Sequence, residues 1–579
     1  MSTSRLSRLA GVFGATFWTI AFVQADPAPE PPIYNSRSTS HPETGLNGMV
    51  SSRDAVATRA GLEVLRNGGN AIDAAVTVGF AMAVTTPQAG NIGGGGFMMV
   101  HSAESNETVA IDYREKAPLE ATRDMFLDKD GNVDSERSRY SRLAAGVPGT
   151  VAGLAMALEK FGTISLAEAL EPAIGLAENG FPISEDLYQS LKLGKERLQL
   201  GAPQVISVFY DNEGKALGPG SIVKLPALAK TLSLIAKEGP SAFYEGKIAD
   251  MITADMRANG GIISKADLKA YKPALREPVR GNYKGYEIVS MPPPSSGGAH
   301  IVQILNILEP LDLKSKGHNS AATIHLMAEA MKFAYADRSK HLGDSDFNPI
   351  PLDWITSKSY ASEIREKMDF KKATPSVEIL PGEPIHEGLD TTHFSVIDRY
   401  GNAVSNTYTV NFSFGSKIMP KGTGFFLNNE MDDFSSKPGV PNAYGLVGGE
   451  FNAIEAEKRM LSSMSPTIVL KDGKPYLLTG SRGGSQIITM SLQVILNVIE
   501  HGMNLSEAVS APRVHHQWLP DVLRVEPGVS SDTIALLEGK GYEVQLGGAM
   551  GTTNSAMLQE GVFYGAGDPR RPDSLAEGF

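Results

Sequence analysis

The sequence predicts an α+β protein in which antiparallel sheets are covered by layers of helices. Strand patterns occur in pairs joined by short polar turns, at residues 97–114, 392–410 and 467–479. Residues 52–90 contain Ala-rich apolar stretches, and most of residues 150–347 has the spacing of amphipathic helices. Because hairpins and apolar helices follow one another along the chain, we expect the two kinds of element to pack on each other as layers.

The N-terminus has the pattern of an export signal. Arg5 and Arg8 precede an uncharged run over residues 9–23, and the small residue Ala25 comes before the first acidic side chain. The run is short for a bilayer span, which needs about 20 residues. We expect a signal peptide over residues 1–25 and a protein that is periplasmic or secreted, with no membrane span after cleavage. A membrane anchor is the alternative, but the following segment is Pro-rich and polar and has no stop-transfer pattern.

Residues 52–90 are expected to form two helices separated by Gly68 and Gly69, because glycine commonly ends a helix. Both stretches are nearly all apolar, so we expect both helices to be buried. The glycine-rich loop that follows lacks the spacing of a phosphate-binding loop, and a nucleotide site there has little support. The loop leads into the first hairpin, which has Arg114 at its exit.

In the middle of the chain, Ser295 or Ser296 is expected to cap the helix that follows "MPPPSSGG". A linker-like segment from Lys371 to Gly388 then precedes the second hairpin, which turns at residues 398–402. In the last third of the chain, a glycine loop after the third hairpin opens a long helix.

The composition is that of an ordinary globular protein, with 579 residues of which 42% are hydrophobic and 20% charged. The length suits one large or two medium domains. The net charge of -12 argues against nucleic acid as a partner, because phosphates demand a clustered positive surface. The chain has no cysteine, which removes disulfides, thiol nucleophiles and thiolate metal sites. Any covalent catalysis must therefore use oxygen or nitrogen.

Familiar metal and hydrolase motifs are absent from the sequence. There is no H-E-x-x-H, and the adjacent His515 and His516 have poor spacing for a shared metal. No G-x-S-x-G elbow occurs, so a serine triad assembled from scattered residues stays open without local support. We expect neither a metal nor an organic cofactor.

Two threonines, Thr391 and Thr392, stand where the linker-like segment meets the second hairpin. A threonine hydroxyl is a weak nucleophile unless a base lies beside it, and a free α-amino group can be that base. The unperturbed pKa of this amine, about 7.7–8.0, is close to neutral pH, whereas that of lysine is about 10.4. The amine exists only if the chain is cut before Thr391. From this local pattern alone, an ordinary pair of strand threonines is the favoured interpretation.

Five longer motifs change that balance. In chain order they are "TPQAGNIGGGGFM", "MPPPSSGG", "DTTHFSVIDRYGNAVSNTYTVNFSFG", "LNNEMDDFSSKPGVPNAYGLVGG" and "LSSMSPTIVLKDGKPYLLTGSRGGS". With them the chain resembles the γ-glutamyltranspeptidase (γ-glutamyltransferase) family from about Gly48 to Phe579. This family belongs to the N-terminal nucleophile hydrolases. The resemblance therefore implies a four-layer αββα sandwich and a precursor that cuts itself into two subunits.

The resemblance places the cut between Asp390 and Thr391. It implies a large subunit of residues 26–390 and a small subunit of residues 391–579, which stay together as a heterodimer. The catalytic positions that it implies are the nucleophile Thr391, its hydrogen-bonding partner Thr409, and the oxyanion-hole glycines Gly483 and Gly484.

The resemblance also implies which residues hold the two ends of a γ-glutamyl group. An α-carboxylate needs cationic or hydroxyl donors, and an α-ammonium needs acceptors. The implied residues are Arg114, Ser462 and Ser463 for the carboxylate, Asn411, Glu430 and Asp433 for the ammonium, and Tyr444 in a lid loop. Without the resemblance, the arginine would be a solvated charge and the acidic turn a helix cap or surface loop. The family has Glu or Gln at position 430, and proline occurs in it at the positions of Arg482 and Met460.

The function that the resemblance implies is transfer or hydrolysis of the γ-glutamyl group of glutathione and other γ-glutamyl compounds. The acceptors would be water, amino acids or short peptides, and the balance between hydrolysis and transfer stays open. A glutaryl-type (cephalosporin) acylase of the same fold is one alternative, although the lid-like segment favours the transpeptidase. An uncleaved, non-catalytic binding protein of this fold is the other.

Overall fold

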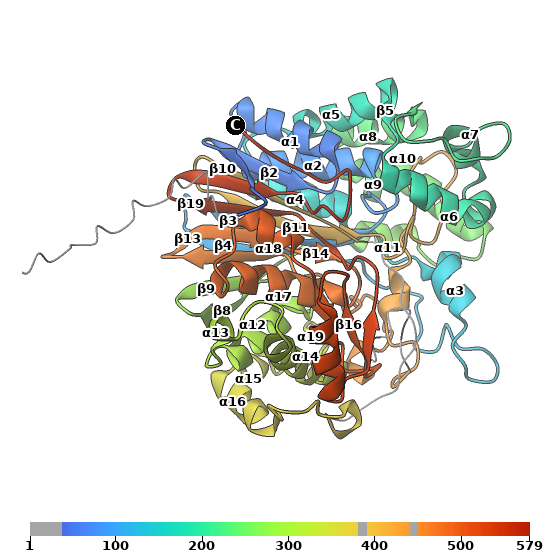
Figure 1. Ribbon diagram of the computed structural model, residues 1–579. Coiled ribbons are helices and arrows are strands. Elements are labelled where there is room, and N and C mark those ends of the chain that lie inside the picture. Colours follow the sequence, from blue (N-terminus) through green and yellow to red (C-terminus); the bar gives the residue numbers. More distant parts are fainter. Residues whose placement is uncertain (1–37, 380–390, 441, 443–445, 447) are drawn as a thin grey trace, which may run out of the picture. The chain divides into compact units, whose positions relative to one another are not determined.

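The structure is a computed structural model, and it describes residues 38–379, 391–440, 442, 446 and 448–579. Residues from Ser38 onward form one compact unit. At its centre lie two stacked seven-stranded sheets, each antiparallel throughout, with helices over both outer faces (Figure 1). This is the four-layer αββα sandwich that was expected. The predicted signal peptide lies outside the described residues.

The first sheet is built around the second predicted hairpin. Its strands, in spatial order, are β21 (Leu575–Gly578), β2 (Gly48–Ser52), β10 (Thr391–Asp398), β11 (Ala403–Thr409), β3 (Gly95–Ser102), β4 (Glu107–Asp112) and β7 (Ala274–Arg276). All eight residues of β10 are buried, because the strand has a neighbour on each side and a layer on each face.

The second sheet packs against the first through an apolar interface. Its strands, in spatial order, are β1 (Glu43–Gly45), β20 (Val562–Ala566), β19 (Ser555–Gln559), β13 (Lys474–Thr479), β12 (Thr467–Lys471), β9 (Tyr286–Ser290) and β8 (Val279–Tyr283). Met49 and Ile397 from the first sheet share one buried cluster with Ile468 and Phe563 from the second. Burial of these side chains from both sheets holds the inner layers together.

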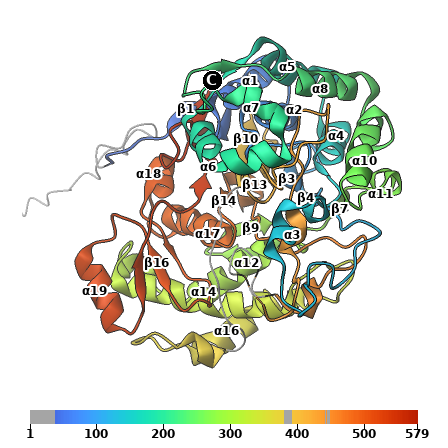
Figure 2. The same cartoon turned by 90° about the vertical axis from the view of Figure 1, so that its right-hand side faces the viewer.

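One group of helices covers the outer face of the first sheet (Figure 2). The group comprises α1 (Ala55–Arg66), α2 (Ala71–Thr85), α4 (Thr150–Phe161), α5 (Leu166–Asn179), α6 (Glu185–Gly201), α7 (Ile206–Phe209), α8 (Pro226–Glu238), α9 (Ser241–Tyr244), α10 (Lys247–Ala258) and α11 (Lys265–Ala270). Helix α2 contacts both β10 and β11, so it lies directly over the central hairpin.

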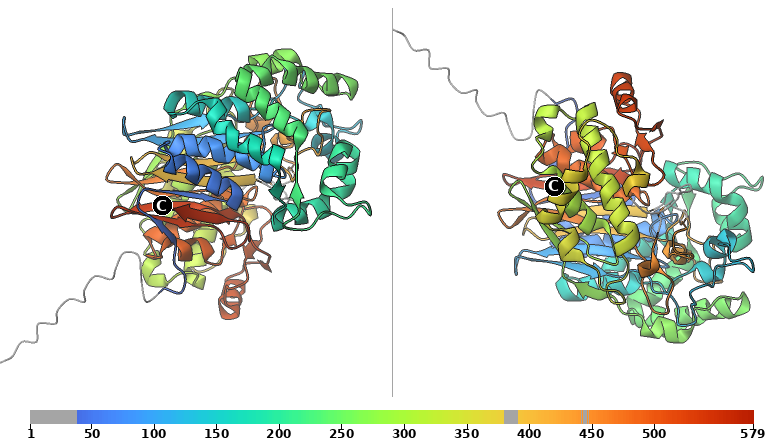
Figure 3. Two further views of the ribbon diagram at one scale, coloured as in Figure 1. Left: turned by 90° about the horizontal axis from the view of Figure 1, so that it is seen from above. Right: turned by 90° about the horizontal axis from the view of Figure 1, so that it is seen from below.

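A second group covers the outer face of the second sheet, as the view from below in Figure 3 shows. It comprises α12 (Gly297–Leu308), α13 (Leu313–Lys316), α14 (Ala321–His341), α15 (Leu352–Ile355), α16 (Lys358–Lys367), α17 (Gln486–Ile499), α18 (Leu505–Ser510) and α19 (Ser531–Gly539). Within the described part of the chain, no helix combines the length and the apolar character that a membrane span requires.

Short elements complete the fold. They are the helix α3 (Ser135–Tyr140), the 3-10 turns η1 (Arg142–Ala144), η2 (Pro203–Val205), η3 (Ser376–Ile379), η4 (Glu430–Asp433) and η5 (Glu450–Asn452), and the strands β5 (Phe181–Pro182), β6 (Ile222–Val223), β14 (Ser481–Arg482), β15 (Val514–His515), β16 (Leu523–Val525), β17 (Val544–Leu546) and β18 (Thr552–Thr553).

The two helices expected before the first hairpin are both present, with Gly68 between them at a φ of +93°. The prediction that both are buried is confirmed for α2, in which every residue is buried, and wrong for α1. Arg59, Glu63 and Arg66 are exposed on α1. They are spaced three or four residues apart, so they share one face, and the opposite face carries the apolar contacts.

The segment predicted as a linker is anchored in its described half, residues 371–379. The Ala373 N–H donates to the Lys540 carbonyl at 2.8 Å, and the Ser376 N–H donates to Asp521 Oδ2 at 2.8 Å. The anchors lie more than 140 residues away in the chain, which is why no local hydrophobic period marked this segment. Residues 380–388 lie outside the described residues.

Candidate active site

Thr391 is the first residue of β10 and lies opposite Thr409, the last residue of β11. The Thr391 hydroxyl donates a hydrogen bond of 3.4 Å to Thr409 Oγ1, which also accepts the Asn411 N–H at 2.7 Å. Both threonines are buried. Since β2 and β3 flank this hairpin, the two hydroxyls are held on a rigid part of the sheet.

The backbone of Thr391 has a second support that sequence reasoning missed. Arg53, which is buried just after β2, donates a hydrogen bond of 3.2 Å from Nη1 to the Thr391 carbonyl. Its Nη2 pairs with Asp186, and Arg571 Nη1 lies 3.0 Å from the other oxygen of that carboxylate. Thr391 is thus held both through its side chain and through its backbone carbonyl.

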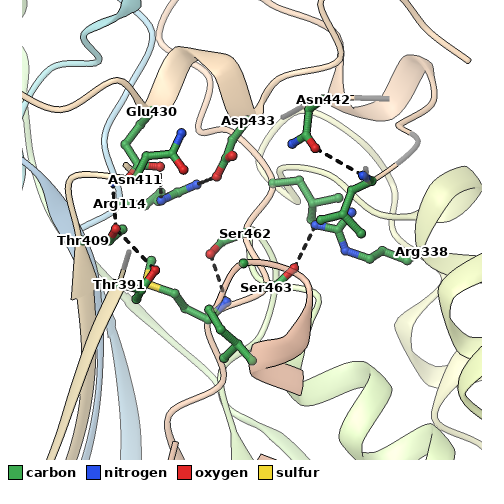
Figure 4. Close-up of a pocket in the computed structure, with 15 residues that line it drawn as sticks. Arg114, Arg338, Thr391, Thr409, Asn411, Glu430, Asp433, Asn442, Ser462 and Ser463 are labelled. Carbon is green, nitrogen blue, oxygen red and sulfur yellow. Dashed lines mark hydrogen bonds and ion pairs between the residues drawn. The ribbon is translucent and has the colours of Figure 1, made fainter. Parts of the chain in front are cut away.

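A cavity of about 20 Å³ opens beside Thr391 (Figure 4). Its described lining includes nine of the sequence-predicted residues, namely Arg114, Thr391, Thr409, Asn411, Glu430, Asp433, Ser462, Ser463 and Gly484. Gly483 adjoins this set in the chain but does not line the cavity. Asp390 and Tyr444 lie outside the described residues. Most of the predicted site therefore converges on one place from segments far apart in the sequence.

One guanidinium in this site faces three carboxyl groups. Arg114 Nη1 lies 2.6 Å from Glu430 Oε2, and Nη2 donates to Asp433 Oδ2 at 2.6 Å. Glu115 Oε2 lies 3.7 Å from Nη1, and this glutamate was not predicted as part of the site. It directly follows Arg114 at the end of the first hairpin, so its position in the chain could have indicated it.

Burial raises the pKa of Glu115, Glu430 and Asp433, and the charge of Arg114 opposes the rise in each case. Both Glu115 and Glu430 are fully buried, at 0% exposure. Among the described residues, Arg114 is the one guanidinium within ion-pair distance of these three carboxyls, so their full ionisation leaves a surplus of negative charge around it. A cation entering the cavity would relieve that surplus.

The two serines of the site lie on a loop that is tied to the start of α12. Ser296 Oγ donates to the Ser462 carbonyl at 2.8 Å, and Ser295 Oγ donates to the Met464 carbonyl at 2.6 Å. Ser296 occupies the N-cap position of α12, but its hydroxyl makes no capping hydrogen bond. Of the two serines predicted to cap this helix, Ser296 does not do so through its hydroxyl, whereas Ser295 Oγ accepts the N–H of Gly297, the first residue of α12, at 3.1 Å.

Gly483 and Gly484 form the turn between β14 and α17, with φ values of +123° and +55°. Only glycine adopts such values readily, and the absence of a side chain lets the chain turn beside the cavity. Helix α17 begins two residues later, so its positive end lies close to the same place.

Residues 57–578 match the family model described as Gamma-glutamyltranspeptidase. The chain belongs to the γ-glutamyltranspeptidase family. Among curated members, the glutathione hydrolase proenzyme of Escherichia coli (strain K12) is 53% identical over 557 residues, covering 96% of each chain.

Acylases also resemble this γ-glutamyltranspeptidase-family chain. Acylase ACY 1 proenzyme of Pseudomonas sp. (strain V22) is 39% identical over 525 residues, covering 90% of this chain and 91% of its own. The crystal structure of a cephalosporin acylase from Bacillus halodurans gives a TM-score of 0.83 at 28% identity, covering 96% of this chain and 99% of that chain. The crystal structure of Helicobacter pylori γ-glutamyltranspeptidase gives a TM-score of 0.55 at 49% identity, covering 56% of this chain and 93% of that chain. The higher identities to transpeptidases favour that family, and activity has to be argued from the site.

Two positions depart from the γ-glutamyltranspeptidase pattern without disturbing the site residues. Met460 is buried in an apolar cluster with Phe434, and its carbonyl accepts a hydrogen bond of 3.3 Å from Arg114 Nε. Arg482 is buried in β14, just ahead of the glycine turn. Because this hydrogen bond uses the backbone carbonyl of residue 460, it does not depend on which side chain stands at that position.

The adjacent histidines of this γ-glutamyltranspeptidase-family chain have separate partners. His515 is hydrogen-bonded to Thr489 at 2.8 Å and to Gln517 at 3.0 Å, and His516 Nε2 lies 3.2 Å from Asp521. In the described part of the chain, no three His, Asp or Glu side chains are grouped so as to hold a metal ion.

Proposed function

We propose that this chain cleaves itself before Thr391 and then transfers the γ-glutamyl group of glutathione and other γ-glutamyl compounds to water or to amino acid and peptide acceptors. The observation that carries the proposal is the buried Thr391–Thr409 hydroxyl pair, which opens on a cavity lined by carboxylates and an arginine. The name glutathione hydrolase, borne by a relative that is 53% identical, supports the same substrate class.

The base for Thr391 is its own α-amine, which cleavage sets free. Among the described residues that line the cavity there is no histidine and no lysine. His393, two residues along β10, is hydrogen-bonded to Thr407 and Ser395, and burial lowers its pKa to about 3. The two lining carboxyls are engaged with Arg114. The free amine, with an unperturbed pKa of about 7.7–8.0, is the remaining group suited to accept a proton near neutral pH.

The reaction then has two acyl-transfer steps. The amine accepts the hydroxyl proton, Thr391 Oγ1 attacks the γ-carbonyl carbon, and the C–N bond breaks as the leaving amine takes up the proton. The backbone N–H groups of Gly483 and Gly484 stabilise the charge that develops on the carbonyl oxygen. Water or an acceptor amine next attacks the Thr391 ester, and the Thr391 hydroxyl is regenerated.

The remaining polar residues hold the α-carbon end of the γ-glutamyl group. Glu430, Asp433 and Asn411 receive its ammonium, and Arg114, Ser462 and Ser463 its carboxylate. The cavity of about 20 Å³ has room for about one water molecule, whereas ligand pockets measure roughly 300–1,000 Å³. Arg114 lines this space and pairs there with both carboxylates.

Cleavage at Asp390–Thr391 would leave the two pieces, residues 26–390 and 391–579, joined in one heterodimer. In the first sheet, β10 lies between β2, which precedes the cut, and β11, which follows it. Strand β11 in turn pairs with β3, again from before the cut. Each piece alone would expose unpaired strand edges and apolar faces. Export after removal of residues 1–25 completes the proposed maturation.

A variant that removes the nucleophile tests this function. Thr391→Ala should give one uncut polypeptide without activity, and Thr391→Ser, which keeps a hydroxyl, should still be cut. Electrophoresis, N-terminal sequencing of the small piece and turnover of γ-glutamyl-p-nitroanilide report the outcome. Two bands and normal turnover in the alanine variant would contradict the proposal. Faster turnover of the glutaryl than of the γ-glutamyl p-nitroanilide by the unmodified sequence would favour the acylase alternative.

A further inference from the structure

A second cavity, of about 480 Å³, adjoins the first one and has no part in the proposed chemistry. Its volume is within the range of roughly 300–1,000 Å³ that is usual for ligand pockets. The described lining comes from α3 and the residues just before it, and from η4 and the residues that follow it. The cavity is therefore bounded by both of the pieces that the proposed cut would produce.

The two cavities share a wall. Asp433 lines the first cavity, whereas its neighbours in the chain, Asp432 and Phe434, line the second. Asn442, labelled in Figure 4, lines both. An extended dipeptide spans about 7 Å, at roughly 3.3–3.6 Å per residue. A substrate that continues past the bond attacked by Thr391 therefore needs space beyond the first cavity, and the second cavity offers it next to the same wall.

Positive charge predominates in the described lining of the second cavity. Its charged members are Arg139, Lys437 and Asp432, two positive side chains and one negative, in a chain whose net charge is -12. Arg139 is 29% exposed, and its Nε donates to Asp432 Oδ1 at 3.4 Å. Within the described part of the chain its two Nη groups donate no hydrogen bond, so both can bind an anion. The planar arrangement of these groups matches the two oxygens of a carboxylate.

An apolar surface lies in the same cavity, formed by Val133, Phe434 and Val440. The part of glutathione that leaves when the γ-glutamyl bond breaks is a dipeptide, cysteinylglycine. It carries an amine at the broken bond, a small thiol side chain and a terminal carboxylate. The side chain suits the apolar surface, and the carboxylate suits the cationic lining.

We propose that the second cavity binds the part of the substrate beyond the scissile bond, and that Arg139 binds its terminal carboxylate. This assignment rests on the proposed function. Peptide acceptors use the same cavity, because attack by an acceptor amine is the reverse of the step in which the leaving amine departs. The first cavity thus selects the γ-glutamyl group, and the second selects what is joined to it.

Two donors that differ only in the terminal carboxylate test this assignment. The self-cleaved protein hydrolyses glutathione, or glutathione amide in which that carboxylate is a neutral carboxamide, without an acceptor. Both donors give the same Thr391 ester, so kcat/KM compares only the steps up to release of the dipeptide. In the unmodified protein, kcat/KM should be about 5- to 20-fold higher for glutathione, because its carboxylate makes a charge-assisted contact. Released glutamate is measured in both cases.

Variants show whether Arg139 is the source of this preference. In Arg139→Gln, the ratio of the two kcat/KM values should fall to within about 2-fold of unity, and Arg139→Lys, which keeps the charge, should retain part of the preference. Arg137→Gln removes an exposed positive charge from the same helix and should leave the ratio unchanged. If Arg139→Gln is not cleaved or does not fold, Lys437→Gln replaces it, since the Lys437 side chain is exposed. This variant should lower the ratio about 2- to 3-fold.

Equal kcat/KM values for the two donors in the unmodified protein would overturn the proposal. So would a ratio that Arg139→Gln, or Lys437→Gln in its place, leaves unchanged. If both values fell equally in Arg139→Gln, the result would show that Arg139 only braces Asp432. Failure of the proposed function is different, because the unmodified protein would then release no glutamate from either donor.

Discussion

Thr391 and Thr409 face each other across the β10–β11 hairpin, and the hydroxyl of the first donates a 3.4 Å hydrogen bond to the hydroxyl oxygen of the second. The contact is long for an O–H···O bond, as catalytic contacts often are before substrate binds. Because Thr409 Oγ1 also accepts the Asn411 N–H, its position is fixed independently of Thr391. The pair therefore orients the nucleophile from a fixed point on the neighbouring strand.

Removal of the Thr409 hydroxyl should slow catalysis more than it weakens binding. In Thr409→Ala we expect kcat to fall about 10- to 100-fold with a smaller change in KM, because the lost hydrogen bond orients the nucleophile. Thr409→Ser keeps the oxygen and should stay within about 3-fold of the original rate. Steady-state kinetics on fully cleaved protein give both constants. Alanine and serine variants of equal activity would mean that the Thr391–Thr409 contact has no catalytic role.

The free amine of Thr391 predicts a rise of kcat with pH. Below the pKa of the amine, kcat should increase about tenfold per pH unit, and above it the rate should level off. The midpoint is expected near the unperturbed pKa of an α-amine, about 7.7–8.0. Measuring kcat separates this effect from titration of Glu430 and Asp433, which acts on substrate binding. A flat profile between about pH 5 and about pH 9, with chemistry rate-limiting, would contradict an amine base.

The central hairpin shows how much local sequence determines. Alternation along β10 and a turn at residues 398–402 are both visible in the sequence, and together they place Thr391 opposite Thr409. The continuous apolar run of α2 likewise predicts full burial. By the same reasoning the exposed face of α1 could have been predicted, because Arg59, Glu63 and Arg66 already have helical spacing in the sequence.

The missing part of the site comes from contacts between distant segments. Arg53 meets the Thr391 carbonyl across 338 positions, and Arg338 meets Ser463 across 125. In the sequence, Arg338 stands in "ADRSKH" near the end of a helix, where a charged residue is usually solvated. It is buried only because α14 packs across the start of α12 and the serine loop, a placement that no local pattern encodes. The family resemblance supplied the residues that local patterns could not.

The carboxyl cluster around Arg114 predicts a pH-dependent gain in stability from Glu430→Gln. Burial raises the pKa of Glu430, so the folded protein binds more protons than the unfolded chain above a pH of about 4.3. The unfolding free energy therefore falls as pH rises through this range, and glutamine, which does not titrate, removes that loss. The melting temperature of the variant minus that of the original protein should become larger from about pH 5 to about pH 8. In a chain of this length, about 1 kcal/mol of unfolding free energy corresponds to about 1 °C in melting temperature.

An exposed glutamate provides the control for this measurement. Glu159 lies at the exposed end of α4, and Glu159→Gln removes the same charge without touching the cluster, so its effect should be small at both pH values. If Glu430 were instead ionised and stabilised by its 2.6 Å contact with Arg114, glutamine would lower the melting temperature, and more so at the higher pH. The sign of the difference between the two pH values therefore decides whether burial or the arginine dominates the pKa of Glu430.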